Sequence, residues 1–128
     1  MRLTSAQRDE LIAHARDEAP FECCGYVTIR DGRVAEVVRG ENTRKSKYGF
    51  ALDPDSLRRI AFIEDEGLEP GVYHSHPRTA AEPSQQDVNE AHYPDALYLI
   101  VGFPAGEPEL RGWWIVDGKV EEEDLVVE

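Results

Sequence analysis

Two histidines separated by one residue, His74 and His76, are the first feature of the sequence whose type and spacing could do chemistry. They lie at the end of a short run, 71–75, that we expect to form a β-strand. Residues two apart on a strand point to the same face, so both imidazoles would lie side by side while Ser75 points away. Two neighbouring imidazoles can chelate a borderline-soft divalent ion such as zinc.

A third possible ligand, Asp87, follows a proline-containing loop over 76–83. Ser84 is suited to cap a short helix, which would place Asp87 in the first helical turn. Its carboxylate could then reach back to the two imidazoles. Three protein ligands leave a fourth position for water, which is the arrangement of a catalytic zinc site rather than a structural one.

Each of these residues also has an ordinary structural interpretation. A single histidine is more often a surface or core residue than a metal ligand. Ser84 with Asp87 is close to a capping box, and an acidic side chain is favourable at the positive end of a helix. Capping suits Ser84 in either case, but we expect Asp87 to give up that role if it binds a metal. The complete spacing is much rarer by chance than either half.

The elements that must position these residues follow from apolar periodicity and from turn residues. Thr4 or Ser5 can cap the first helix, and Pro20 ends it. Asp31-Gly32, between two alternating runs, indicates a hairpin, and Asp53-Pro54 opens a second helix. The expected helices span residues 5 to about 18, 54 to about 66, and 84 to Pro94, and the expected strands span 24–30, 33–39, 50–52, 71–75, 96–103, 109–116 and 119–127.

The order of these elements predicts an α/β (α+β) sandwich in which helices flank one mixed, largely antiparallel sheet. The chain has 128 residues, which suits a single domain spanning 1–128.

The composition limits the classes of partner and the compartment. The formal net charge of −12 is opposite to the field that binds nucleic-acid phosphates, so we expect no nucleic-acid partner. No apolar run approaches the roughly 20 residues that span a membrane, and the polar segment 1–10 is unlike a signal peptide. Cys23 and Cys24 are adjacent, a spacing that disfavours a disulfide between them. These features predict a cytoplasmic protein without a membrane anchor.

The whole pattern resembles the JAMM motif of the MPN+ (Mov34/PAD-1) zinc metallopeptidases, since it reads His74-x-His76-x7-Ser84-x2-Asp87. Glu22, in the run FECCG, is similar to the upstream glutamate that completes that motif. The chain looks most similar to the prokaryotic stand-alone members, which include sulfur-carrier-protein peptidases and archaeal proteases for ubiquitin-like modifiers. The resemblance covers nearly the whole chain and implies one MPN/JAB1-type domain with a cytidine-deaminase-like architecture.

The resemblance also implies roles for the five residues of the motif. One zinc ion would be held by His74, His76 and Asp87. Glu22 would act as general base toward the attacking water and then deliver the proton to the leaving amine, while Ser84 would donate a hydrogen bond to the oxyanion. The implied reaction is hydrolysis of a peptide or isopeptide bond at the C-terminal tail of a small ubiquitin-like or sulfur-carrier protein. The choice between these bonds, and the oligomeric state, stay open.

A local cluster of basic residues interrupts the acidic chain: Arg39, Arg44, Lys45 and Lys47. Ubiquitin-like and sulfur-carrier proteins are usually acidic, and an acidic enzyme repels them at long range. We therefore expect this cluster to dock the substrate protein. The alternative is an ordinary solvated loop.

Other functional interpretations are weaker. We expect Cys23 and Cys24 to be buried structural residues rather than nucleophiles, because a nucleophilic cysteine needs a depressed pKa and a partner histidine. We assign no function to His14, which lies among charged residues, or to His92. The main alternative to an enzyme is a non-catalytic MPN-type scaffold, but such scaffolds typically lack the histidines or the aspartate that are present here.

Overall fold

Alternating apolar side chains build one eight-stranded sheet at the centre of the molecule. The computed structural model describes all residues, 1–128. Its strands are β1 (Arg2–Leu3), β2 (Cys24–Arg30), β3 (Arg33–Arg39), β4 (Glu69–His76), β5 (Leu97–Gly102), β6 (Glu109–Val116), β7 (Lys119–Glu123) and β8 (Val126–Val127). They lie side by side in the order β7-β6-β5-β4-β2-β3-β1-β8.

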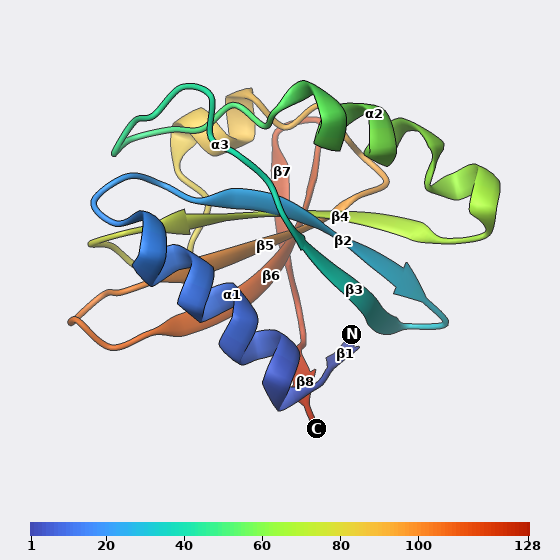
Figure 1. The fold of residues 1–128 in the computed structure, drawn as a ribbon, viewed down its shortest axis with the longest axis horizontal. Helices are drawn as coiled ribbons and strands as arrows, with labels where there is room; N and C mark the ends of the chain where they lie inside the picture. The colour runs from blue at the N-terminus through green and yellow to red at the C-terminus, as the bar shows by residue number, and fades with distance from the viewer.

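Helices cover both faces of this sheet (Figure 1). They are α1 (Ser5–Glu18), α2 (Pro54–Phe62) and α3 (Gln85–Asn89), with a 3-10 turn at Glu64–Glu66. Figure 1 shows α1 on one side of the sheet and both α2 and α3 on the other. None of the helices combines the length and the apolar content needed to cross a lipid bilayer.

Two apolar layers, one on each face of the sheet, form the core. The α1 face buries Leu11 and Ile12 of the helix against strand residues such as Val27 and Leu99. The opposite face carries the second layer, whose buried residues include Cys24, Tyr26, Leu52, Ile60, Ile63, Leu68, Val72, Tyr98, Ile100 and Trp113. Burial of apolar area on both faces stabilises the sheet and fixes which side chains of each strand point to which helix.

Strand β4 lies in the middle of the sheet and carries the two histidines. It pairs antiparallel with β2, where Cys24 is opposite His74, and parallel with β5, where His76 is opposite Gly102. Tyr73 belongs to the α1 layer and Val72 to the other layer. The period of two along a strand therefore places both histidines on the face covered by α2 and α3.

The sequence predicted most element bounds, and the helix-flanked mixed sheet is confirmed. The hairpin over 24–30 and 33–39 and the strand 109–116 occur with the expected bounds. Asp31 and Gly32 have φ angles of 51° and 74°, the left-handed conformation that a tight hairpin turn needs.

Several expected elements differ from the structure. The segment 50–52 forms only an isolated bridge, between Asn42 and Leu52. The second helix ends at Phe62 and continues as the 3-10 turn, which stops at Gly67 with a φ of 76°. The third helix ends at Asn89, before Pro94 is reached, and the last expected strand is divided into β7 and β8.

The sheet also extends further than expected. Strand β1 was not predicted, because two residues are too short to show a period, and β4 extends through His76. At the opposite end of the sheet, β7 pairs only with β6 and carries three glutamates in a row, Glu121, Glu122 and Glu123.

A buried polar contact ties α1 to β4. His14 Nδ1 lies 2.6 Å from the hydroxyl oxygen of Tyr73, and both side chains are buried. Burial lowers the pKa of His14, and the positive charge of Arg39 lowers it further, so the ring is neutral at pH 7. His14 is therefore a core residue that hydrogen-bonds across the α1 layer.

We expect Tyr73→Phe to lower the free energy of unfolding by about 1–3 kcal/mol, because it leaves a buried ring nitrogen without a partner. Urea denaturation at pH 7 measures the change. Tyr26→Phe is the control, since Tyr26 is a largely buried tyrosine whose hydroxyl is not among the buried groups without a partner and so reaches water. Equal losses in the two variants would contradict the assigned role of the His14 contact.

Candidate active site

The two histidines of β4 meet through their outer ring nitrogens. His74 Nε2 lies 3.2 Å from His76 Nε2, and the two residues are 1% and 7% exposed. The Phe50 ring stacks on His74 with centroids 4.6 Å apart. Strand spacing thus predicted the pair correctly, and the stacked ring fixes the orientation of His74.

Asp87 reaches this pair from the beginning of α3. Its Oδ2 lies 3.0 Å from His76 Nε2 and 3.2 Å from His74 Nε2. The same oxygen accepts a hydrogen bond from the Ser84 backbone N–H at 2.9 Å, and the Asp87 N–H donates to Ser84 Oγ at 3.1 Å. One carboxylate oxygen of Asp87 therefore faces both the helix cap and the imidazoles, so the capping role that we expect a metal-bound Asp87 to give up is present in this structure.

The loop that brings α3 to the histidines crosses β5 at Gly102. A Cβ at this glycine would lie 2.4 Å from the backbone nitrogen of Ala81, so only glycine lets the loop pass. The loop is held there by Trp113 Nε1, which donates to the Ala81 carbonyl at 2.9 Å. His76 Nδ1 lies 2.9 Å from the Ala80 carbonyl. Donation to that carbonyl protonates Nδ1 and leaves the Nε2 lone pair free to bind a cation.

Glu22 lies in the segment between α1 and β2. Its neighbour Cys23 is joined to β4 twice: the Cys23 N–H donates to Ser75 Oγ at 2.8 Å, and the Ser75 N–H donates to the Cys23 carbonyl at 3.2 Å. Glu22, His74 and His76 each offer a ligand atom, and these atoms lie within 4.8 Å of one another. The Glu22 side chain is 4% exposed, and its Oε1 has no hydrogen-bond partner.

The carboxylates are in an unusual electrostatic setting. Burial raises the pKa of Glu22 to about 8, with the negative charge of Asp87 contributing in the same direction and His76 opposing it. Burial would also raise the pKa of Asp87, but the adjacent His74 and His76 imidazoles and the Ser84 backbone N–H hold it well below its usual range. A cation at this point would favour the ionised form of both carboxyl groups.

The residues present fit a metal ion. Ligands of a tetrahedral zinc ion lie about 3.3 Å apart, since zinc–nitrogen bonds are about 2.0–2.1 Å long. The separations of 3.0–3.2 Å among His74 Nε2, His76 Nε2 and Asp87 Oδ2 are close to that spacing. Glu22 lies at a looser spacing and has an unpartnered buried oxygen, which suits a group that faces a water.

A buried asparagine that the sequence did not single out, Asn42, joins Glu22 to the neighbouring loop. Its Nδ2 donates to the carbonyls of Glu22 and Gly49, at 2.9 and 3.2 Å. Its Oδ1 accepts from the N–H groups of Arg44 and Ala51, at 3.1 and 3.0 Å. All its hydrogen-bonding capacity is therefore used to fold the loop that carries Phe50. The only local signal was an asparagine within a polar segment.

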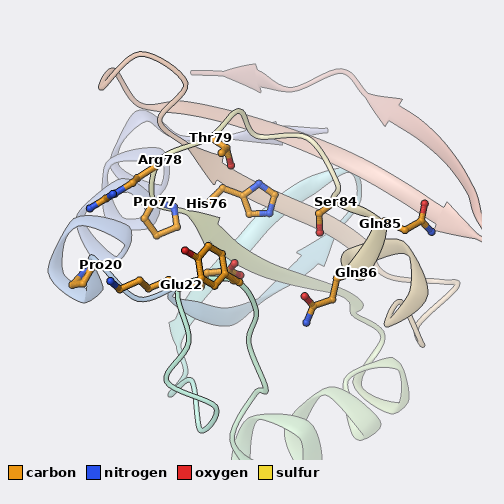
Figure 2. Close-up of a pocket in the computed structure, with 11 residues that line it drawn as sticks. Pro20, Glu22, His76, Pro77, Arg78, Thr79, Ser84, Gln85 and Gln86 are labelled. Carbon is orange, nitrogen blue, oxygen red and sulfur yellow. The ribbon is translucent and has the colours of Figure 1, made fainter.

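The candidate active site opens onto a cavity of about 450 Å³. It is lined by Pro20, Glu22, Lys47, Tyr48, His76, Pro77, Arg78, Thr79, Ser84, Gln85 and Gln86. Figure 2 shows His76 between Ser84 on one side and Pro77 and Arg78 on the other. Because Ser84 Oγ accepts the Asp87 N–H, its own proton is available for a bound molecule.

Only one of the four predicted docking residues lines the cavity. Arg39 turns toward α1 and forms salt bridges with Glu10 and Asp17, and Arg44 pairs with Glu90 at 3.3 Å. Lys45 is exposed and lies outside the cavity lining, and Lys47 alone of the four lines the cavity. Residues that are close in sequence are thus separated by the direction of their side chains.

The two cysteines are buried, as expected. Cys23 and Cys24 are free and buried. Burial raises the pKa of the Cys23 thiol to about 12 and raises that of Cys24 as well, so neither is a thiolate at neutral pH. His92 is exposed and lies outside the cavity lining.

Comparison with known proteins gives a consistent set of relatives. A family model described as prokaryotic homologs of the JAB domain matches residues 4–116. The CysO-cysteine peptidase of Mycobacterium tuberculosis is 38% identical over 124 residues, covering 91% of this chain and 84% of the relative. The desampylase of Haloferax volcanii is 30% identical over 120 residues, covering 87% and 86%. A solution structure of a Desulfitobacterium hafniense protein superposes with a TM-score of 0.84 at 33% identity, covering 99% and 92%.

We expect Asn42→Ala to lower the free energy of unfolding by about 2–4 kcal/mol, because four backbone groups lose their partner at once. Urea denaturation gives this value, and hydrogen exchange of the 43–51 amides reports loss of order in the loop. Asn89→Ala, at an exposed position of α3, is the control and should change stability by less than about 0.5 kcal/mol. An unchanged exchange pattern in Asn42→Ala would contradict the assigned role.

Proposed function

Because the chain belongs to the prokaryotic JAB family of JAMM-type hydrolases, we propose that it is a zinc-dependent peptidase that cleaves the C-terminal tail of a small ubiquitin-like or sulfur-carrier protein. The observation that carries the proposal is the convergence of two imidazole nitrogens and a carboxylate oxygen beside the unpartnered, buried Glu22. Relatives named CysO-cysteine peptidase, desampylase and probable TtuB-protein conjugate cleaving protease support a small protein as the substrate.

In this proposal His74, His76 and Asp87 hold the metal. Neutral imidazole nitrogens and a carboxylate oxygen are ligands that zinc accepts, and three of them suit a catalytic site. When bound there, zinc polarises the scissile carbonyl and lowers the pKa of a water to about 7. The Ala80 carbonyl and the Phe50 ring hold the two imidazoles in the orientation that binding needs.

Glu22 moves the proton. Its carboxylate takes a proton from the attacking water and gives it to the amine nitrogen as the carbon–nitrogen bond breaks. A pKa raised toward neutrality by burial suits a group that must first accept and then release a proton. Ser84 donates a hydrogen bond from its hydroxyl to the developing oxyanion.

The proposal extends to the whole chain and its compartment. Residues 1–128 would act as one catalytic domain, and the free thiols of Cys23 and Cys24 suit a reducing cytoplasm. No observation favours the scaffold alternative, since all of the expected ligands converge in the fold. Of the four docking residues, Lys47 still supports a docking role because it lines the cavity. The salt bridges of Arg39 and Arg44 weaken the case for a docking role of those two residues.

We expect the purified protein to bind one zinc ion per chain and His74→Ala or Asp87→Ala to lower the affinity by at least about 100-fold, since each removes a ligand. Competition with a chromophoric chelator measures the affinity, and elemental analysis gives the stoichiometry. His92→Ala, which removes an exposed imidazole, is the matched control and should bind like the parent protein. Parent-like affinity in His74→Ala would refute the assigned ligand set.

We expect Glu22→Gln to keep zinc and to lose about 10²–10⁴-fold in kcat, because the amide can neither accept nor deliver a proton. Chelator competition and cleavage of a carrier protein with an extended tail, followed by mass spectrometry, provide the two measurements. Substantial turnover in the zinc-loaded variant would remove Glu22 from the mechanism while leaving the metal site intact.

A further inference from the structure

Two cationic side chains on the wall of the active-site cavity have no acidic partner. Lys47 and Arg78 both line the cavity, both are exposed, and neither takes part in a salt bridge or a side-chain hydrogen bond. Glu22 is the one carboxylate in the lining, and its side chain is buried. The cavity therefore presents positive charge to an incoming molecule.

This arrangement contrasts with the rest of the protein. The chain has 26 acidic and 14 basic residues, so acidic partners are abundant. Some of the other arginines use them, since Arg39 binds Glu10 and Asp17, and Arg111 binds Glu82 and Glu122, whereas Arg30 is unpaired like Arg78. Two unpaired cations in one cavity of so acidic a protein indicate a site for an anionic group of a ligand.

The position of Arg78 relates this charge to the direction of the substrate. Figure 2 shows Pro20, Pro77 and Arg78 at one end of the cavity and Ser84 at the other, with His76 between them. Ser84 faces the oxyanion in the proposed reaction. The leaving amine lies beside Glu22, which lines the same cavity as Arg78 and Lys47. A leaving group in this cavity can therefore reach Arg78, at the end away from Ser84.

Resting on the proposed peptidase function, we propose that Arg78 and Lys47 bind the C-terminal α-carboxylate of a single amino acid that is released from the tail of the carrier protein. Water forms a carbon–oxygen bond to the scissile carbonyl, the carbon–nitrogen bond breaks, and the proton passes through Glu22 to the amine. The products are a carrier with a new C-terminal carboxylate and a free amino acid. A guanidinium group can hold such a carboxylate by two parallel hydrogen bonds.

The inference distinguishes the two bonds that the sequence left open. A lysine side chain that leaves an isopeptide brings no α-carboxylate to this end of the cavity, because that lysine is embedded in a protein. An amino acid at the very end of a tail brings one within a few atoms of the scissile bond. A cavity of about 450 Å³ is within the range of small-molecule sites and accommodates one residue. The two unpaired cations thus favour cleavage of a terminal peptide bond over cleavage of an isopeptide bond.

Three matched substrates test the inference with the zinc-loaded enzyme. Each is a carrier protein extended by one residue: alanine with a free carboxylate, alanine amide, or aspartic acid amide. We expect kcat/KM to be about 10–100-fold higher for the free acid than for both amides, because only the α-carboxylate is placed correctly. In Arg78→Gln and Lys47→Gln this preference should fall toward one, because kcat/KM falls much more for the free acid than for alanine amide.

Arg30→Gln is the matched control, because Arg30 is an exposed, unpaired arginine at the far end of β2. It should keep the full preference for the free acid. Equal cleavage of acid and amide by the parent enzyme, or an equal loss on both substrates in Arg78→Gln, would overturn this inference and leave the peptidase function standing. If aspartic acid amide is cleaved as efficiently as the free acid, the cations recognise a side-chain carboxylate, and this inference is overturned too. Failure to cleave any carrier would overturn the proposed function, and this inference with it.

Discussion

The register between β2 and β4 is the constraint on which the whole site depends. Cys23 and Ser75, 52 residues apart, exchange two hydrogen bonds, and Cys24 lies opposite His74. This pairing carries the peptide of Glu22 to the face where the imidazoles point. A shift of β4 by one residue would turn both imidazoles into the apolar layer under α1. The alternation of Val72 and Tyr73 between the two layers prevents that shift, so the hydrophobic core determines which chemistry is assembled.

The same packing keeps two acidic groups close together in a buried place. Isolated carboxylates are costly to bury as anions, and here the fold compensates for one of them: Asp87 is bound by a helix cap and faces two imidazoles, whereas Glu22 has an oxygen with no partner. The difference in pKa between the two groups comes from this asymmetry. Asp87 stays ionised and can bind a cation, and Glu22 can exchange a proton near neutral pH.

The sequence predicted the parts of the site that depend on local spacing. His74 and His76 lie on one strand and Ser84 and Asp87 on one helical turn, so periodicity was enough to place them. Glu22 was found only by resemblance, since nothing local marks it. Asn42, Phe50 and Gly102 were missed because their roles depend on what the fold brings near them. The basic cluster does not line the cavity as a unit for the same reason, since sequence proximity does not say that Arg39 turns toward α1.

The acidic edge strand has a consequence for the behaviour of concentrated solutions. An open sheet edge is where a second molecule can add a strand, and β7 is such an edge. Its charge is unusually durable: the hydrogen bond from Arg111 lowers the pKa of Glu122, and that from Trp114 lowers the pKa of Glu123. Near the isoelectric point of about 4.7, Glu122 and Glu123 therefore keep their salt bridges with Arg111 and the N-terminal ammonium. These charged groups along β7 disfavour the addition of a second strand, so we expect precipitation near that pH without growth of the sheet through this edge.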